Sequence, residues 1–114
     1  MEDCLFCKIA AHVIPANIIY EDDVIVAFKD INPQAPIHVL IIPKDHYASL
    51  NDLDDTGGHT LGHLLAKAPI IAETAGVRAS GYRLVLNTGK DSGQEVLHIH
   101  FHLLGGRQMK WPPG

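Results

Sequence analysis

Hydrophobic positions recur along the chain with two spacings, and each spacing predicts a different kind of element. Apolar, β-branched runs at residues 18–20 and 24–28 flank a polar turn at 21–23, which predicts a β-hairpin. A third apolar run covers 38–42 and stops at Pro43, and a fourth covers 83–87. From 97 to 104, apolar residues alternate with histidines, which predicts a fifth strand with one apolar face.

One longer segment has helical spacing instead. Its apolar residues follow the i, i+3, i+4, i+7 pattern of an amphipathic helix: Leu61, Leu64, Leu65, Ala68 and Ala72. Pro69 lies inside this pattern, so we expect a kink or a split there, and Gly76 is the expected stop. A shorter helix is predicted over residues 6–12. The elements together predict an α+β domain with a mostly antiparallel five-stranded sheet, one face of which is left free for a site.

Composition and charge narrow the class of protein. The 114 residues suit a single domain spanning 1–114, and 46% hydrophobic with 19% charged residues exclude a disordered chain. The formal charge of −4 and the lack of a Lys/Arg cluster argue against nucleic-acid binding. The N-terminus lacks the basic and apolar segments of a signal peptide, and no apolar run is long enough for a membrane. We therefore expect a soluble cytoplasmic protein.

Histidine is the unusual residue of this chain, with eight copies. His98, His100 and His102 occupy alternate positions of the predicted fifth strand and so share one face, while the apolar residues between them face the helix. Neutral imidazole is abundant near pH 7 and is nucleophilic without a separate base. The pattern predicts phosphoryl or nucleotidyl transfer with the middle ring, His100, as nucleophile. The alternative is a metal-binding strand, because His-x-His is a common chelating pair.

A second candidate site is the pair Cys4-x-x-Cys7. In the cytoplasm thiols stay reduced, so the pair indicates metal binding or redox chemistry rather than a structural disulfide. A thioredoxin-type pair follows a strand of a βαβ unit, and no strand is predicted before Cys4. Two inert cysteines are the remaining reading. We favour zinc, which needs two further ligands.

The segment 98–104, His-Ile-His-Phe-His-Leu-Leu, resembles the signature of the histidine triad (HIT) superfamily. Residues 14–16, 28–38, 42–44, 93–96 and 105–114 are similar to its Hint branch, so the resemblance covers nearly the whole chain. It implies a HIT-like fold and a homodimer joined through a dimer-wide sheet. It also implies a hydrolase that cleaves the P–N bond of adenosine or guanosine 5′-phosphoramidates, and related acyl-adenylates, through a nucleotidyl-histidine intermediate.

The resemblance also assigns roles to residues. His100 corresponds to the nucleophile, His102 to the histidine that contacts the phosphate, and His38 to the histidine that holds and polarises the nucleophile from the neighbouring strand. Asp30 corresponds to the acid that binds the ribose. The nucleotide-binding set as a whole is Phe6, Ile14, Asp30, Ile31, Asn87, Gly93, Gln94, Glu95, Val96, His100, His102 and Trp111.

Within this set the resemblance implies that Phe6, Ile14 and Ile31 line the base pocket. Those that correspond to the phosphate-binding loop and its surroundings are Asn87, Gly93, Gln94 and Val96. By residue type alone, Asp30 and Asn87 are equally typical of turns, and the two isoleucines of a core. Some Hint proteins carry a serine where Glu95 stands here. A carboxylic acid there can protonate a departing amine, whereas a carboxylate repels the phosphate.

In cysteine-bearing HIT proteins, histidines at the positions of His46 and His98 bind zinc with the cysteines. The resemblance therefore implies a structural Zn²⁺ held by Cys4, Cys7, His46 and His98, and chemistry that needs no metal. Alternative functions are a dinucleoside-polyphosphate hydrolase or nucleotidylyl transferase of another HIT branch, and a non-catalytic nucleotide-binding regulator. The closing residues 111–114 favour the Hint branch.

Overall fold

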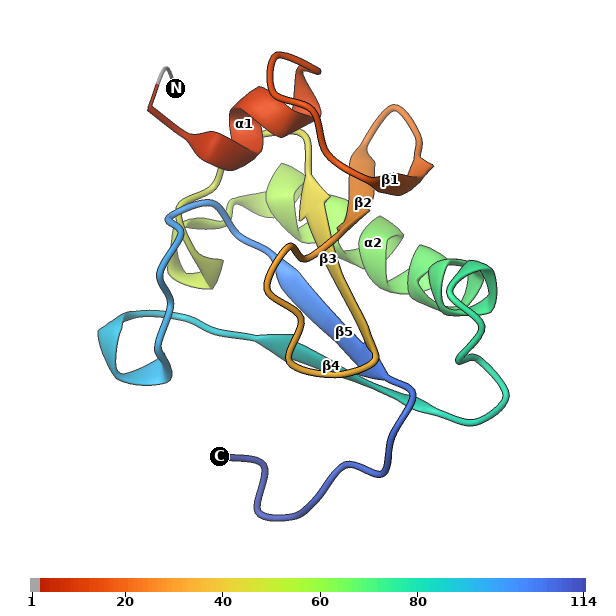
Figure 1. Cartoon of the computed structure of the whole chain (residues 1–114). Helices are drawn as coiled ribbons and strands as arrows, with labels where there is room; N and C mark the ends of the chain where they lie inside the picture. The colour runs from red at the N-terminus through yellow and green to blue at the C-terminus, as the bar shows by residue number, and fades with distance from the viewer. Residues whose placement is uncertain (1–2) are drawn as a thin grey trace.

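The structure, a computed structural model, describes residues 3–114 and contains a five-stranded antiparallel sheet with helices on both of its faces (Figure 1). The elements in chain order are α1 (Leu5–Ala10), β1 (Ile18–Glu21), β2 (Ile25–Lys29), β3 (Ile37–Pro43), α2 (Asp55–Thr74), β4 (Tyr82–Leu86) and β5 (Phe101–Gly105). Short 3-10 turns form at Leu50–Asp52 and Lys90–Ser92. The strand order β1-β2-β3-β5-β4 confirms the predicted α+β class and the hairpin of β1 and β2.

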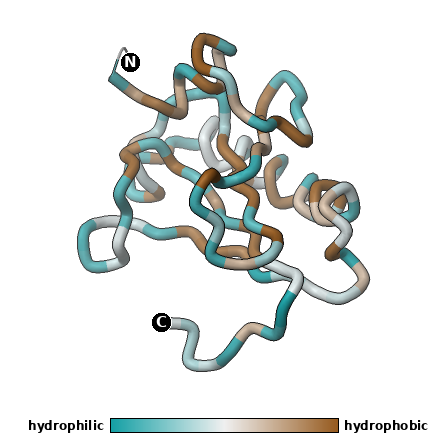
Figure 2. Tube along the Cα trace, in the orientation of Figure 1, coloured by the Kyte–Doolittle hydropathy of each residue, from teal (hydrophilic) through white to brown (hydrophobic). Residues whose placement is uncertain are grey.

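Each face of the sheet has its own hydrophobic core. On one face, Leu64 and Ile71 of α2 pack with Ile41 and Leu103 of the central strands. On the other face, α1 places Phe6 and Ile9 in a second cluster of buried side chains, which also contains Val26, Phe28, Leu40 and Ile42. Figure 2 shows hydrophobic residues gathered along the central strands. The second face is therefore only partly free, because α1 covers the end near Phe28.

Helix α2 runs unbroken through Pro69, so the predicted split at this residue is wrong. The Asp54 side chain caps its start by accepting a hydrogen bond from the Gly57 amide at 2.7 Å. A proline inside a helix costs roughly 3 kcal/mol. The fully buried Leu64 and Ile71 flank it, and each contributes about 1.5–3 kcal/mol by burial. Packing on the sheet is enough to keep one continuous helix.

Strand β5 begins at Phe101 rather than at Leu97, which corrects the predicted strand over 97–104. The residues before Phe101 bend, and the Ile99 amide donates to the Tyr47 carbonyl at 2.7 Å, beyond the end of β3. The predicted alternation survives the bend. Ile99, Phe101 and Leu103 all lie in the core under α2, so the histidines between them lie on the opposite face.

Asp22 joins the β1–β2 hairpin to α2. One carboxylate oxygen accepts the amides of Val24 and Ile25, and the other lies 2.8 Å from both the Tyr20 hydroxyl and the His63 Nε2. These hydrogen bonds hold the pKa of Asp22 well below its ordinary value, against the opposing effect of burial. Among residues 3–114, no helix combines the length and the apolar character that a membrane span requires.

Candidate active site and metal cluster

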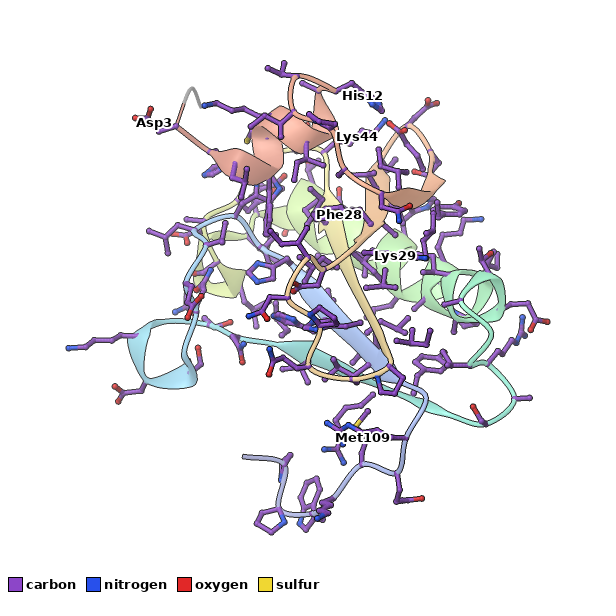
Figure 3. The ribbon with its side chains drawn as sticks, viewed as in Figure 1. Asp3, His12, Phe28, Lys29, Lys44 and Met109 are labelled. Carbon is purple, nitrogen blue, oxygen red and sulfur yellow. The ribbon has the colours of Figure 1, made fainter. Side chains whose placement is uncertain are left out.

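A cavity of about 380 Å³ opens on the sheet face that α1 leaves uncovered. Its walls come from α1, the β2–β3 loop, strands β3 and β5, and the β4–β5 loop: Phe6, Asp30, Asn32, Gln34, His38, Leu40, Asn87, Gly93, Glu95, Val96, His100 and His102. Phe28, labelled in Figure 3, packs edge-on against Phe6 with ring centroids 5.6 Å apart. This contact fixes the aromatic wall of the cavity.

A chain of hydrogen bonds fixes the protons of His38 and His102. The Gln34 amide donates to His38 Nδ1 at 3.0 Å, so the ring proton of His38 is on Nε2. That Nε2–H donates to His102 Nδ1 at 2.8 Å, which leaves His102 with its own proton on Nε2. Burial lowers the pKa of His38 against the opposing charge of Asp30, and burial with the neighbouring histidines lowers the pKa of His102 to about 4. Both rings are therefore neutral near pH 7.

His100 is held in the opposite tautomer. Its Nδ1–H donates to the His98 carbonyl at 2.8 Å, so its Nε2 carries a lone pair. The side chain is buried, with its ring centroid 5.1 Å from that of Phe6 and 5.0 Å from that of His102. The cavity thus contains a nucleophilic nitrogen, from His100, next to a donor N–H, from His102.

The partner of His38 differs from the one expected. The resemblance implied that His38 holds His100, but in the structure His38 bonds His102, and the His98 carbonyl holds His100. The register explains this, because Leu40 pairs with His102 and His38 with Leu104. His38 and His102 are consequently diagonal neighbours on one face, within side-chain reach.

The remaining residues of the predicted nucleotide-binding set divide into two groups. Asp30, Asn87, Gly93, Glu95 and Val96 line the cavity with Phe6 and the histidines. Asp30 also acts as a turn residue, because its Oδ1 accepts the Asn32 amide at 2.8 Å while its Oδ2 lies 3.4 Å from His38 Nε2. The loop 88–95 turns at Gly89 and Gly93, whose φ angles of +82° and +86° favour glycine.

Four predicted residues lie outside the cavity walls. Ile31 and Trp111 are exposed, at 101% and 81% of full accessibility, and Ile14 packs beside the α1 core. The Gln94 side chain braces the loop instead. Its Oε1 accepts the Gly89 amide at 2.9 Å, and its Nε2 donates to the carbonyls of Ala48 at 2.7 Å and Val96 at 3.1 Å.

The sequence analysis missed three cavity residues, Asn32, Gln34 and Leu40. Leu40 has a signal in the sequence, because it lies two residues from His38 on the same strand and so on the same face. Asn32 and Gln34 belong to an irregular loop, where periodicity carries no information about direction.

Cys4, Cys7, His46 and His98 bring four ligand atoms together, all within 4.8 Å of one another. His98 Nδ1 lies 3.3 Å from the Cys4 sulfur, 3.4 Å from the Cys7 sulfur and 3.2 Å from His46 Nδ1. The Cys7 sulfur lies 3.3 Å from His46 Nδ1. A tetrahedral zinc ion separates a nitrogen from a sulfur donor by roughly 3.5 Å and two nitrogen donors by roughly 3.3 Å. The donor set therefore fits such an ion.

The surroundings of these four residues also suit a cation. His98 Nε2–H donates to the Pro43 carbonyl at 2.8 Å, which leaves Nδ1 as the ligand atom and fixes the ring. Burial lowers the pKa of His98 to about 4, so this ring stays neutral. Burial and the Cys4 thiol raise the pKa of Cys7 to about 11. A positive charge beside the Cys7 sulfur would oppose this shift and favour its thiolate.

Known proteins resemble this chain along nearly its whole length. A purine nucleoside phosphoramidase of Escherichia coli is 47% identical over 95% of this chain and 91% of its own length. An uncharacterized HIT-like protein of Synechococcus elongatus is 52% identical over 99% of this chain and 98% of its own length.

Solved structures agree with these sequence relatives. The crystal structure of a HIT family hydrolase from Legionella pneumophila superposes with a TM-score of 0.94 at 55% identity, covering 98% of this chain and all of the other. A histidine triad protein from Clostridium difficile superposes with a TM-score of 0.93 at 44% identity, covering 96% of each chain. The HIT domain model matches residues 11–109. The resemblance seen in the sequence is confirmed, and the chain belongs to the HIT domain family, the family of the hydrolases to which it is similar.

Proposed function

We propose that this protein hydrolyses the P–N bond of purine nucleoside 5′-phosphoramidates and the P–O anhydride bond of related acyl-adenylates, with His100 as nucleophile. The observation that carries the proposal is the pair of opposite tautomers in one cavity, an Nε2 lone pair on His100 beside an Nε2–H on His102. The first attacks phosphorus, and the second donates to a phosphoryl oxygen as negative charge develops there. The phosphoramidase of Escherichia coli, 47% identical, supports the same class of reaction.

The reaction proceeds in two displacements. His100 Nε2 donates its electron pair to phosphorus, the P–N bond breaks, and the departing nitrogen keeps that electron pair and takes up a proton, leaving as an amine. Water then attacks the nucleotidyl-histidine and gives up a proton, which balances the proton taken up by the amine. The P–Nε2 bond breaks, and His100 recovers its lone pair. The products are a nucleoside monophosphate and an amine, and one water is consumed.

The cavity supplies places for the rest of the nucleotide. We assign the ribose hydroxyls to Asp30, whose Oδ2 faces the His38 side of the cavity. The base would lie against Phe6, and the phosphate against Gly93 and Val96 of the loop. An aliphatic and aromatic pocket of this kind accepts a purine with little hydrogen-bond discrimination between adenine and guanine.

We propose Zn²⁺ as the ion of the cluster Cys4, Cys7, His46 and His98, in a structural role. When bound, zinc joins the start of α1 to the segment before β5 and holds both sulfurs as thiolates. His100 needs no metal to free the lone pair of its Nε2, because the ring proton is on Nδ1 and is donated to the His98 carbonyl.

The family resemblance implies a dimer-wide sheet, and we also propose that two copies form it by pairing through β4, one of the two outer strands of the sheet. Pairing there would cover an edge whose hydrogen-bonding groups otherwise face solvent. Trp111, which lies outside the cavity of its own chain, would then be free to approach that of the second copy. The remaining expectations, one domain over 1–114 and a cytoplasmic location, stay predictions.

The test is hydrolysis of adenosine 5′-phosphoramidate, followed by release of adenosine monophosphate. We expect turnover by the native protein, none by His100→Ala, and unchanged turnover by His59→Ala, a matched control on the exposed side of α2. Retained activity in His100→Ala would place the nucleophile elsewhere. No turnover by the native protein, with adenosine monophosphate still bound, would favour the regulator, and preferential cleavage of a dinucleoside polyphosphate would favour the other HIT branches.

A further inference from the structure

A second cavity, of about 750 Å³, lies next to the histidine cavity. Its lining comes from the start of the chain, the segment after β3 and the end of the β4–β5 loop: Asp3, Cys4, Leu5, His46, Ala48, Glu95, Val96 and Leu97. Glu95 and Val96 line both cavities. The second cavity therefore shares part of its lining with the site of the proposed chemistry.

The second cavity combines apolar surface with negative charge. Leu5 and Leu97 are 46% and 64% exposed, so both offer apolar surface to a ligand in this hollow. Asp3 and Glu95 add two carboxylates to its lining. Figure 3 shows Asp3 beside the start of α1, and in the same view the β4–β5 loop lies below it. Within the described part of the chain, residues 3–114, no Lys or Arg lines this cavity. An apolar chain that carries a positive charge complements this surface.

The position of Glu95 connects this surface to the reaction. His100 is buried at the floor of the first cavity, whereas Glu95 is an exposed residue on its wall. In-line displacement at phosphorus puts the leaving group on the side away from the attacking nitrogen. A leaving group on that side lies away from the buried His100, and it would enter the second cavity if it passes Glu95 and Val96, which line both hollows.

We propose that the second cavity binds the amine portion of the substrate and selects leaving groups that carry an aliphatic chain with a positive charge. This inference rests on the proposed phosphoramidase function. It gives the Glu95 carboxylate a role in its charged form, because a carboxylate that repels phosphate attracts a cation placed beyond it. Asp3 acts with it from the far side of the hollow, and Leu5 and Leu97 contact the chain.

The test compares two adenosine phosphoramidates of nearly equal size, one with an N-hexyl group and one with an N-(5-aminopentyl) group, which ends in an ammonium. We expect the native kcat/KM to be higher for the ammonium compound. Asp3→Asn and Glu95→Gln should each reduce the ratio of the two values by about two- to fivefold, the range for an exposed charge pair. Glu73→Gln, an exposed acid on α2, is the matched control and should leave the ratio unchanged.

Two leucine variants test whether apolar contacts contribute to binding of the aliphatic chain. Leu97→Ser should lower kcat/KM for both chain-bearing compounds relative to unsubstituted adenosine 5′-phosphoramidate. Leu65→Ser, at a residue on α2 that is 47% exposed, should not change this relation. A matching loss in both variants would overturn the proposal that Leu97 contacts the chain.

Binding separates this inference from the proposed function. The dissociation constants of the two chain-bearing compounds are measured in a His100→Ala background, with and without Asp3→Asn and Glu95→Gln. Charge-dependent binding without native turnover would support the subsite and contradict the hydrolase. Turnover with the same ratio of kcat/KM and of dissociation constants in every variant would support the hydrolase and overturn the subsite.

Discussion

His98 of the metal cluster and His100 of the cavity lie two residues apart in one segment, but their rings are oriented in opposite ways. His98 donates Nε2–H to the Pro43 carbonyl and presents Nδ1 to the cysteines, whereas His100 donates Nδ1–H to the His98 carbonyl and presents Nε2 to the cavity. The backbone carbonyl that each ring contacts thus decides which nitrogen is free. Alternate residues with the same side chain thus acquire different chemistry, because their rings donate to different backbone carbonyls.

Replacing one residue of each cluster tests whether the two clusters are independent, and the largest effect is expected at His100. His100→Gln, which keeps most of the buried volume, should lower kcat for adenosine 5′-phosphoramidate by about 10⁴-fold, because the lone pair that attacks phosphorus is lost. Its metal content, measured by plasma emission, should equal that of the native protein. A parallel loss of metal would mean that the two clusters are not independent.

Cys7→Ser should have the reverse profile. Loss of one sulfur from a four-donor site should lower the metal content and reduce the free energy of unfolding by on the order of 4 kcal/mol, measured by urea denaturation. The kcat per folded molecule should change much less than in His100→Gln. Native protein free of zinc after expression in zinc-supplemented medium would contradict both this prediction and the ion assigned to the cluster.

Gln94 lies between the clusters, and its replacement should have an intermediate effect. Gln94→Leu removes one hydrogen bond to an amide and two to carbonyls, so we expect the β4–β5 loop to lose about 1–3 kcal/mol of support. Because Gly93 and Val96 belong to the proposed phosphate site, KM should rise more than kcat falls. In Gln94→Glu the carboxylate can still accept the Gly89 amide, but it would face the carbonyls of Ala48 and Val96 without a proton to donate. We therefore expect a raised KM in this variant too. A native KM in either variant would contradict the proposed support of the loop by the Gln94 side chain.

The smallest effect concerns pH. Burial holds the pKa of folded His102 at about 4, below its ordinary value of 6.5. A group whose pKa is depressed by folding stabilises the protein above its unfolded pKa, and this contribution is lost as pH falls through the folded pKa. The free energy of unfolding should therefore fall between about pH 6.5 and pH 4. The fall should be shallower in His102→Gln, and equal slopes would contradict the neutral, buried ring.

Strand alternation predicted correctly which residues share a face at positions 98–103, because a period of two is a local property of the chain. It did not predict the start of β5, which depends on where β3 ends and on the Tyr47 carbonyl that meets Ile99. The same limit explains His38, since its partner follows from the β3–β5 register and not from spacing along either strand.

Loops carried the least local information. Cys4 and His46 are far apart in the chain, and only the family resemblance placed them together before the structure did. The Gln94 side chain turns into the backbone and Ile31 turns outward, although both belong to segments that match the family. Side-chain direction in such segments depends on hydrogen bonds to distant residues, which no periodic pattern encodes.

The amide that orients His38 belongs to the main chain of Gln34, and this has a consequence for variation at that position. A peptide N–H does not ionise, and nineteen of the twenty amino acids supply one, so the order of protons from His38 to His102 is indifferent to the side chain at residue 34. Proline is the exception, because it has no N–H to offer. The side chain at residue 34 can therefore change without altering the protons of His38 and His102, as long as the path of the loop keeps that one amide pointed at the imidazole.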